Sequence, residues 1–337
     1  MQKISDFINS ALFHPAFGYY RVKNPIGKTG DFITSPEISQ VFGELIAAYL
    51  IQIASHQKTK IALVEMGAGK GTLFKDILGS IKKLAEKYNA EALDFLNLTT
   101  FHIVEINQVL TDIQKKNLKA WPVKWYENFA DFVDSNSDRE IFFVSNELFD
   151  CFAIDQYVQT EEGWRERVVQ EREFILADFD KKVHDFVEKE VDSLAPIGAV
   201  FEYSVESRNF MKQLCEALKK QGGIAIIIDY GFIKNKFANT LQAIKNHKKC
   251  DVLEAPGEAD ITALVDFNSL QKIVKNIGLN QSIVSQAHFL ISLGIEERRT
   301  IMIGANPKKA REINSAIDRL IGLDQMGELF KCLIVWK

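Results

Sequence analysis

The segment from Glu65 to Thr72 carries the residue types and spacing that most clearly indicate chemistry. It reads Glu65-Met66-Gly67-Ala68-Gly69-Lys70-Gly71-Thr72, follows a short apolar run and opens an amphipathic stretch. Glycines allow the backbone to turn sharply and to approach a ligand closely, and the first turn of a helix presents N–H groups that have no partner inside the helix. The segment therefore predicts a ligand-binding turn between a strand and a helix.

The glycine spacing excludes the common nucleotide-binding motifs. A dinucleotide fingerprint, G-x-G-x-x-G, needs a third glycine at the position of Thr72. A P-loop ends in Gly-Lys-Ser/Thr, whereas Lys70 is followed by Gly71. The E-x-G-x-G-x-G pattern that remains fits the amino-acid part of S-adenosylmethionine (SAM), which carries no phosphate. A tight turn without any ligand is the alternative.

A second acid, Glu105, ends the next apolar run, Phe101–Glu105. In doubly wound sheets, an acid at the end of the second strand typically hydrogen-bonds to ribose hydroxyls. Glu105 lies farther along the chain than the usual separation of about 20 residues, and residues 79–99 absorb the difference as a longer helix and loop. Acids at two successive strand ends favour a cofactor site over a plain turn.

Short apolar runs alternate with longer amphipathic stretches from about residue 60 onward. Strands are expected at 61–64, 100–104, 140–144, 223–228 and 333–336, and helices at 72–87 and 210–220. This alternation predicts an α/β fold with a doubly wound, mostly parallel sheet that is covered on both faces.

The rest of the chain divides into three expected parts. Residues 1–60 are interpreted as an N-terminal helical or lid segment, with a helix that begins at Ser35 as N-cap and continues through Ile51. Residues 61–337 form the core, and residues 155–200 form a small antiparallel insertion within it.

Composition limits the classes of partner. The 337 residues are 47% hydrophobic and 26% charged, with a formal net charge of −4, so no broad nucleic-acid-binding surface is expected. The four cysteines, Cys151, Cys215, Cys250 and Cys332, form no CxxC pair, which argues against a disulfide framework or a zinc site. No metal is therefore expected.

The N-terminus gives an expectation about location. Residues 1–7 contain an early acid and lack both the apolar core of a secretory signal and the arginine-rich pattern of a transit peptide. No stretch approaches about 18 uncharged apolar residues. We therefore expect a soluble cytoplasmic protein without membrane insertion.

Further segments carry a resemblance to a known family. They are Phe17–Tyr20, Gly30–Glu44, Glu65–Leu73, Asn146–Asp150, Asp229–Gly231 and Pro256–Phe267. In these segments the chain resembles the MidA family of class I SAM-dependent methyltransferases, which includes the mitochondrial complex I assembly arginine methyltransferase and its bacterial relatives. Ala68 replaces a proline that is usual in the family's glycine turn, and Ile106-Asn107 replaces a frequent Ser-Pro.

The resemblance implies SAM as cofactor, with S-adenosylhomocysteine as product, and a protein arginine of a complex I core subunit as acceptor. A small-molecule O- or N-methyltransferase and a non-catalytic assembly factor remain alternatives, and the oligomeric state is not predicted. The residues expected to bind the cofactor are Asp31, Thr34, Glu65, Gly67, Gly69, Gly71, Thr72, Glu105 and Asn146.

Acids at later strand ends are the candidate catalytic residues. Methyl transfer from a sulfonium requires the acceptor to be held in line with the methyl group, and carboxylates can hold a guanidinium bidentately. Glu147 and Asp150 follow the third predicted strand, and Asp229 ends the fourth. We expect these three acids in catalytic roles. Helix capping by Glu147 or Asp150, and turn formation by Asp229, are the structural alternatives.

Overall fold

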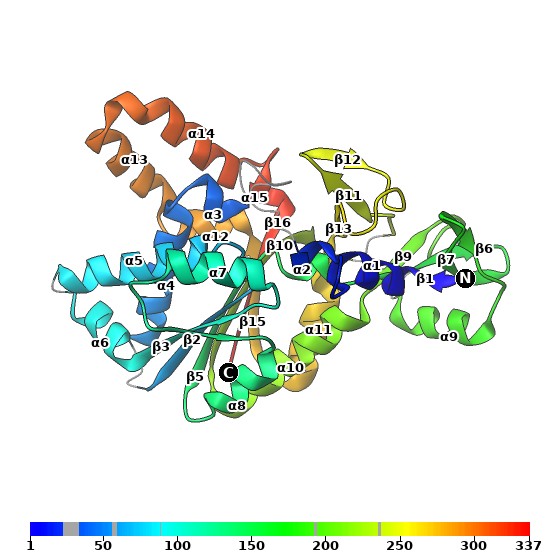
Figure 1. Cartoon of the computed structure of the whole chain (residues 1–337), viewed down its shortest axis with the longest axis horizontal. Helices are drawn as coiled ribbons and strands as arrows, with labels where there is room; N and C mark the ends of the chain where they lie inside the picture. Colours follow the sequence, from blue (N-terminus) through cyan, green and yellow to red (C-terminus); the bar gives the residue numbers. More distant parts are fainter. Residues whose placement is uncertain (23–33, 56–58, 88, 192–193, 235–236) are drawn as a thin grey trace.

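The computed structural model describes residues 1–22, 34–55, 59–87, 89–191, 194–234 and 237–337. Figure 1 shows a large central sheet with helices on both faces and a smaller sheet beside the N-terminus. The strands of the main sheet are β2 (Ile61–Met66), β3 (Thr99–Val104), β4 (Val123–Tyr126), β5 (Glu140–Asn146), β10 (Gly223–Phe232), β14 (Val265–Asp266), β15 (Asn280–Ser285) and β16 (Phe330–Trp336).

The main sheet is mostly parallel and has the order β15-β16-β10-β5-β2-β3-β4, with β14 paired to the end of β10. The strands from β10 to β4 are parallel to one another. Among the described strands of this sheet, only β16 runs against its neighbours, β10 and β15. The predicted doubly wound α/β fold is therefore confirmed, and it places the carboxyl ends of β2, β3, β5 and β10 along one edge.

Helices cover both faces of this sheet. One face carries α4 (Val41–Ala54), α5 (Thr72–Glu86) and α6 (Ala90–Leu98), and the other carries α8 (Phe129–Ser135), α10 (Val205–Gln221) and α11 (Phe267–Ile277). Successive side chains of a strand point to opposite faces of the sheet, so each strand contributes to the apolar core on either face. On β5, Phe142 and Val144 pack in the core on the α4–α5–α6 face, and Ile141 and Phe143 pack in the core on the other face.

Side-chain caps fix where several helices begin. Asn107 caps α7 (Gln108–Asn117), Ser204 caps α10 and Asp266 caps α11, each by accepting a backbone N–H of the first turn. The helix α7 lies between β3 and β4 in the chain. These caps therefore locate the helices that follow strand ends.

The region predicted as an antiparallel insertion forms a second sheet. Its strands are β1 (Gln2–Lys3), β6 (Asp155–Thr160), β7 (Gly163–Gln170), β8 (Glu173–Leu176) and β9 (Val200–Tyr203), all in antiparallel pairs, with α9 (Lys181–Glu190) packed against β7. A third, three-stranded sheet contains β11 (Gln242–Lys245), β12 (Lys248–Cys250) and β13 (Asp260–Thr262).

The predicted N-terminal segment divides between these parts. β1 and α1 (Ile4–Phe13) belong to the second sheet and its surroundings, α2 (Tyr19–Val22) contacts α1, and α4 packs on the main sheet. The helix expected from Ser35 onward is interrupted, because Ser39 has extended backbone angles (φ −156°, ψ 133°). The short helix α3 (Ser35–Ile38) is therefore separate from α4, and Ser35 is its first residue rather than a hydrogen-bonding cap.

A helical excursion between β15 and β16 was not predicted. It contains α12 (Gln286–Ser292), α13 (Ile295–Ala305), a 3-10 turn at Pro307–Lys309, α14 (Ala310–Ile321) and α15 (Met326–Leu329). Another 3-10 turn, Phe149–Cys151, follows β5. The α13–α14 pair projects beyond the sheet in Figure 1, and α14 contacts α3. This excursion therefore supports a short helix that lies over the carboxyl ends of the strands.

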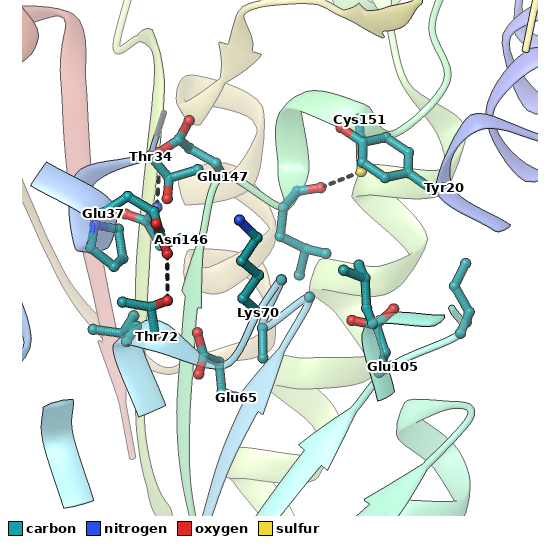
Figure 2. A pocket seen from close by; sticks show the side chains of 18 of the residues that line it. Tyr20, Thr34, Glu37, Glu65, Lys70, Thr72, Glu105, Asn146, Glu147 and Cys151 are labelled. Carbon is teal, nitrogen blue, oxygen red and sulfur yellow. Dashed lines mark hydrogen bonds between the residues drawn. The ribbon is translucent and has the colours of Figure 1, made fainter. Parts of the chain in front are cut away.

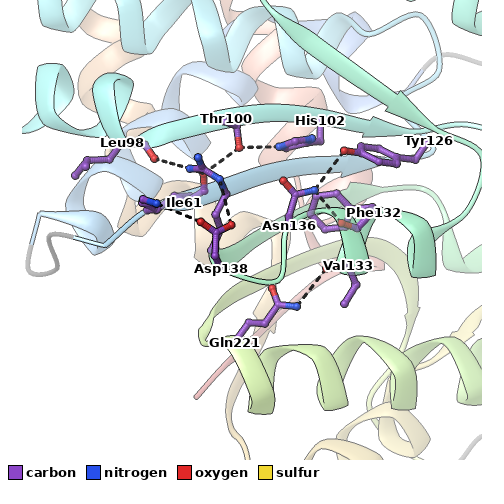
Figure 3. Close-up of polar contacts among 12 residues, drawn as sticks. Ile61, Leu98, Thr100, His102, Tyr126, Phe132, Val133, Asn136, Asp138 and Gln221 are labelled. Atoms are coloured by element: carbon purple, nitrogen blue, oxygen red, sulfur yellow. Dashed lines mark hydrogen bonds and ion pairs between the residues drawn. The ribbon is translucent and has the colours of Figure 1, made fainter.

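Polar contacts close the opposite edge of the sheet (Figure 3). Arg139 donates to the carbonyls of Ile61 (3.4 Å) and Leu98 (3.3 Å), at the starts of β2 and β3. His102 is fully buried, with Nε2 2.7 Å from the hydroxyl oxygen of Thr100. Burial lowers the pKa of His102 to about 4, so its neutral ring is a structural part of this edge.

Gly231 provides a test of the packing at the end of β10. A Cβ there would lie 2.2 Å from the carbonyl oxygen of Val265 on β14. We expect Gly231→Ala to lower the free energy of unfolding by about 1–3 kcal/mol, because β14 must move. The control Gly79→Ala lies in α5 with open space around its Cβ, and it should raise stability by about 0.5–1 kcal/mol. Chemical denaturation measures both, and equal effects would contradict this account.

Candidate active site

A pocket lies over the carboxyl ends of β2, β3 and β5, where open α/β sheets bind their ligands. The space free of protein atoms in this pocket is about 800 Å³, with the open solvent at its mouth included. Figure 2 shows its polar lining. The lining residues used below are Tyr20, Thr34, Glu37, Glu65, Gly67, Gly69, Lys70, Thr72, Glu105, Asn146, Glu147 and Cys151.

The glycine turn forms the floor of this pocket. Gly67, Gly69 and Gly71 have φ values of 71°, 53° and 76°, which other residues rarely adopt. A Cβ on Gly67 would also meet Leu148 at 2.9 Å. Gly67 and Gly69 line the pocket, whereas Gly71 precedes α5 and packs against Gln114 and Leu118.

Two acids lie below the turn and beside it. Glu65, at the end of β2, is 3% exposed, and one of its carboxylate oxygens has no hydrogen-bond partner among the described residues. Burial raises the pKa of Glu65 to about 8. Glu105 follows β3 and accepts from the backbone N–H of Asn107 (2.9 Å) and from the side chain of Gln114 (3.0 Å), and burial raises its pKa as well.

The cover of the pocket comes from α3. The hydroxyl of Thr72, at the start of α5, donates to the carboxylate of Glu37 on α3. Thr34 lies directly before α3 and is largely buried. Asp31, also predicted to bind the cofactor, lies outside the described residues.

Glu147 enters the pocket from the end of β5. Its φ of 53° is left-handed, a conformation that is unfavourable for a residue other than glycine. Its carboxylate accepts from the side chain of Asn146 (2.9 Å) and the backbone N–H of Ser35 (3.3 Å). Burial, and next the charge of Asp150, raise the pKa of Glu147 to about 8.

Asp150 and Asp229 lie behind Glu147 and do not line the pocket. Asp229 is fully buried and accepts backbone N–H groups from Leu148, Phe149, Asp150 and Tyr230. This geometry favours the structural alternative for Asp229, because its carboxylate holds the turn after β5 and lies outside the lining of the pocket. Asp150 accepts the hydroxyl of Tyr230, and its other oxygen is buried with no partner in the described part of the chain.

Several lining residues were missed from the sequence. Lys70 lies inside the glycine turn and projects into the pocket in Figure 2. Its position within this turn could therefore have indicated from the sequence that it lines the pocket. Tyr20 donates to Asp260 at 2.7 Å, and Cys151 donates to the carbonyl of Leu148 at 2.9 Å. Both depend on contacts between distant segments, which the sequence pattern does not reveal.

The donor set fits SAM without a metal. Carboxylates can accept from an ammonium group and from ribose hydroxyls, the glycine turn admits close backbone approach, and Lys70 can pair with a carboxylate. Among the described residues, no group of three or more His, Cys, Asp or Glu side chains could hold a metal ion. Within those same ranges, no helix has the length and apolar character needed to cross a bilayer.

Comparison with known proteins decides the family. Residues 45–285, more than half of the chain, match the Methyltransf_28 family, described as S-adenosyl-L-methionine-dependent methyltransferases. The chain belongs to this family. SAM is therefore the cofactor of this methyltransferase, as the glycine turn predicted.

Similar proteins agree with this assignment over nearly the full length. The mitochondrial protein arginine methyltransferase NDUFAF7 of Danio rerio is 30% identical, over 97% of this chain and 82% of its own. Its human counterpart is 29% identical, over 97% and 78%. A Burkholderia thailandensis protein bound to S-adenosyl-homocysteine has a TM-score of 0.83 and 25% identity, over 99% of this chain and 87% of its own.

The expectation of a cytoplasmic location is wrong, because the NDUFAF7 relatives are named as mitochondrial proteins. It depended on the composition of residues 1–7. The four cysteines form no disulfide in the described part of the chain, but reduced thiols are compatible with reducing compartments in general and do not single out the cytosol.

The raised pKa of Glu65 predicts a pH dependence of stability. Its pKa rises from 4.5 to about 8 in the folded protein, so the folded state keeps a proton that the unfolded chain releases. The associated stability is complete below about pH 4.5 and is lost as the pH rises through about 8. We expect the Tm of the ligand-free Glu65→Gln variant to fall less than that of the wild type between about pH 5 and 9.

Thermal scans across this pH range check the prediction. Glu161→Gln, at an exposed turn, is the control and should follow the wild type. Parallel curves for wild type and Glu65→Gln would show that Glu65 is ionised in the folded protein.

Proposed function

We propose that the chain transfers the methyl group of SAM to an arginine side chain of a protein. The observation that carries this proposal is the desolvated carboxylate of Glu147, which lines the pocket together with further acids. Burial raises the pKa of Glu147 most, and the negative charges of Asp150 and Asp260 raise it further. A site with this electrostatic character favours a cationic acceptor, and a guanidinium matches carboxylate geometry bidentately.

The names of the relatives support the same acceptor class, since they are protein arginine methyltransferases. The MidA resemblance extends the proposal to a core subunit of respiratory complex I as protein substrate. Labelled SAM incubated with the enzyme and purified complex I tests this extension. Label on an arginine of one core subunit is expected, and label confined to small molecules would favour the small-molecule alternative.

For the cofactor, we assign roles from the positions of the lining residues. Glu65 and the backbone at Gly67 and Gly69 face the amino-acid part, and Glu105 faces the ribose. Gly71 supports the turn from behind. Thr34, Thr72 and Asn146 complete the polar wall beside Glu147.

When bound, SAM supplies a methyl group on a positively charged sulfur. Glu147, in its ionised form, binds N–H groups of two guanidinium nitrogens, and one of these two nitrogens is directed at the methyl carbon. As the new N–C bond forms and the S–C bond breaks, that nitrogen loses a proton, and Glu147 accepts it because its pKa lies near neutrality. The apolar side chains of Phe13, Ile106 and Leu110 exclude water from the pocket.

Asp150 acts through Glu147 in this proposal. Its negative charge strengthens the cationic preference of the site, and its hydrogen bond from Tyr230 fixes it in place. We expect the Glu147→Gln, Asp150→Asn double variant to lose about 10²-fold or more of its methyl transfer. Its affinity for S-adenosylhomocysteine should change by no more than a few-fold.

Transfer of labelled methyl groups and calorimetric titration measure the two quantities. The control Asp134→Asn changes an exposed acid on α8 and should keep both. Normal arginine methylation by the double variant would dispose of the acceptor assignment, even if cofactor binding is retained.

Lys70 is the proposed partner of the cofactor carboxylate. It is the one cation among the described lining residues, in a pocket that also contains Glu37, Glu65 and Glu105. Without a cation, these acids would repel the carboxylate of SAM. We expect Lys70→Met to weaken S-adenosylhomocysteine binding about tenfold, and to leave unchanged the affinity for 5′-methylthioadenosine, which lacks the amino-acid part.

Calorimetry with both ligands checks this prediction. Lys75→Met, an exposed lysine on α5, is the matched control and should bind both as the wild type does. Equal losses for the two ligands in Lys70→Met would indicate a general disturbance of the turn instead of carboxylate recognition.

A further inference from the structure

Gln114 connects three parts of the molecule that meet at the cofactor pocket. It lies on α7 with no exposed surface. Its amide nitrogen donates to the carbonyl of Gly69 (2.8 Å) and to the carboxylate of Glu105 (3.0 Å), and its amide oxygen accepts from the indole N–H of Trp125 on β4 (3.0 Å).

These three contacts allow one orientation of the amide. Both amide hydrogens are directed at oxygen acceptors, and the amide oxygen faces a donor, so all three partners are satisfied. A flipped amide would place its oxygen against the oxygens of Gly69 and Glu105 and its nitrogen against the N–H of Trp125. The indole of Trp125 therefore determines which way Gln114 points.

The same contacts determine the orientation of Glu105. One of its oxygens accepts from the backbone of Asn107 and the other from Gln114. Burial raises the pKa of Glu105, and the hydrogen bonds from Asn107 and Gln114 act against that rise. Gln114 thus holds the carboxylate in one plane and favours its ionised form, which is the form that accepts from two hydroxyl groups.

A buried glutamine needs hydrogen-bond partners in any core, so a purely structural role is the alternative. Two of its three partners here, Gly69 and Glu105, line the cofactor pocket. A purely structural role predicts that loss of Gln114 lowers the affinity for every ligand by a similar factor. A positioning role predicts a loss that is specific to the ribose.

We propose that Gln114 is a positioning residue that aims Glu105 at the ribose hydroxyls and thereby determines the discrimination of the pocket for the intact ribose. The inference depends on the role proposed above for Glu105. Removal of Gln114 leaves the carboxylate free to rotate, and the hydroxyl groups lose their fixed acceptor.

The test compares S-adenosylhomocysteine with its 2′-deoxyribose analogue by calorimetry. The wild type should bind the intact ligand more tightly. Gln114→Met removes both donors at similar volume, and we expect it to lower the affinity for S-adenosylhomocysteine about tenfold while affecting the deoxy analogue much less. The ratio of the two affinities should therefore approach one.

Asn117→Ala is the matched control. Asn117 ends the same helix and donates to the same glycine turn, at the carbonyl of Lys70 (2.9 Å), from an exposed position. Its loss should leave the ratio of affinities unchanged. A second variant, Trp125→Phe, removes the donor that orients Gln114 and should reduce the ratio in part.

The outcomes separate this inference from the function on which it depends. A wild type that binds the two ligands equally would show that Glu105 does not recognise the 2′-hydroxyl. The proposed role of Glu105 and the positioning role of Gln114 would then both be wrong. A discriminating wild type with an unchanged ratio in Gln114→Met would overturn the positioning role alone. If Gln114→Met does not fold, Trp125→Phe decides, and an unchanged ratio in that variant also overturns it.

Discussion

Four backbone N–H groups converge on the buried carboxylate of Asp229, and the rest of the active site depends on this contact. Three come from Leu148, Phe149 and Asp150, in the turn after β5, and the fourth comes from Tyr230 on β10 itself. A buried N–H group without an acceptor would destabilise the fold, and Asp229 provides an acceptor for each of these four groups. The contact fixes the turn against the neighbouring strand, so the positions of Glu147 and Asp150 are set together.

The buried acids of the site are unfavourable for the folded protein when they are ionised and no ligand is bound. Burial raises the pKa values of Glu65 and Glu147 to about 8 and of Asp150 to about 6. Raised carboxylate pKa values mean that ionisation of these groups opposes folding near neutral pH. A cationic sulfonium or guanidinium would offset that cost, which is the expected physical signature of a binding site rather than of a stabilising cluster.

The sequence predicted the elements with strong local signals. The apolar runs and the glycine turn located β2, β5, β10 and the floor of the pocket, because buried parallel strands and left-handed glycines have their own composition. Strands β4 and β15 were missed, since half-exposed positions leave them without a continuous apolar run. The break at Ser39 was missed because nothing in the residue types there prevents a helix.

The candidate acids show a different limit. Glu105, Glu147 and Asp229 all follow or end apolar runs and look alike in the sequence, yet two line the pocket and the third lies outside it, where it accepts four backbone N–H groups. What separates them is which donors the tertiary structure brings near each carboxylate. For the same reason the contacts of Gln114 could not be predicted, because they join α7 to the glycine turn, to Glu105 and to β4.

The short helix α3 joins the two ends of the pocket. Glu37 accepts the hydroxyl of Thr72 at the start of α5, and the backbone N–H of Ser35 donates to Glu147 after β5. On its outer side, the hydroxyl of Ser35 lies 3.4 Å from Gln286 of α12, whose side chain also donates to the carbonyl of Leu320 on α14. Because one helix turn carries all of these contacts, a shift of α3 changes the surroundings of Thr72 and Glu147 together. The helices between β15 and β16 are therefore connected, through α3, to the surroundings of both Thr72 and Glu147.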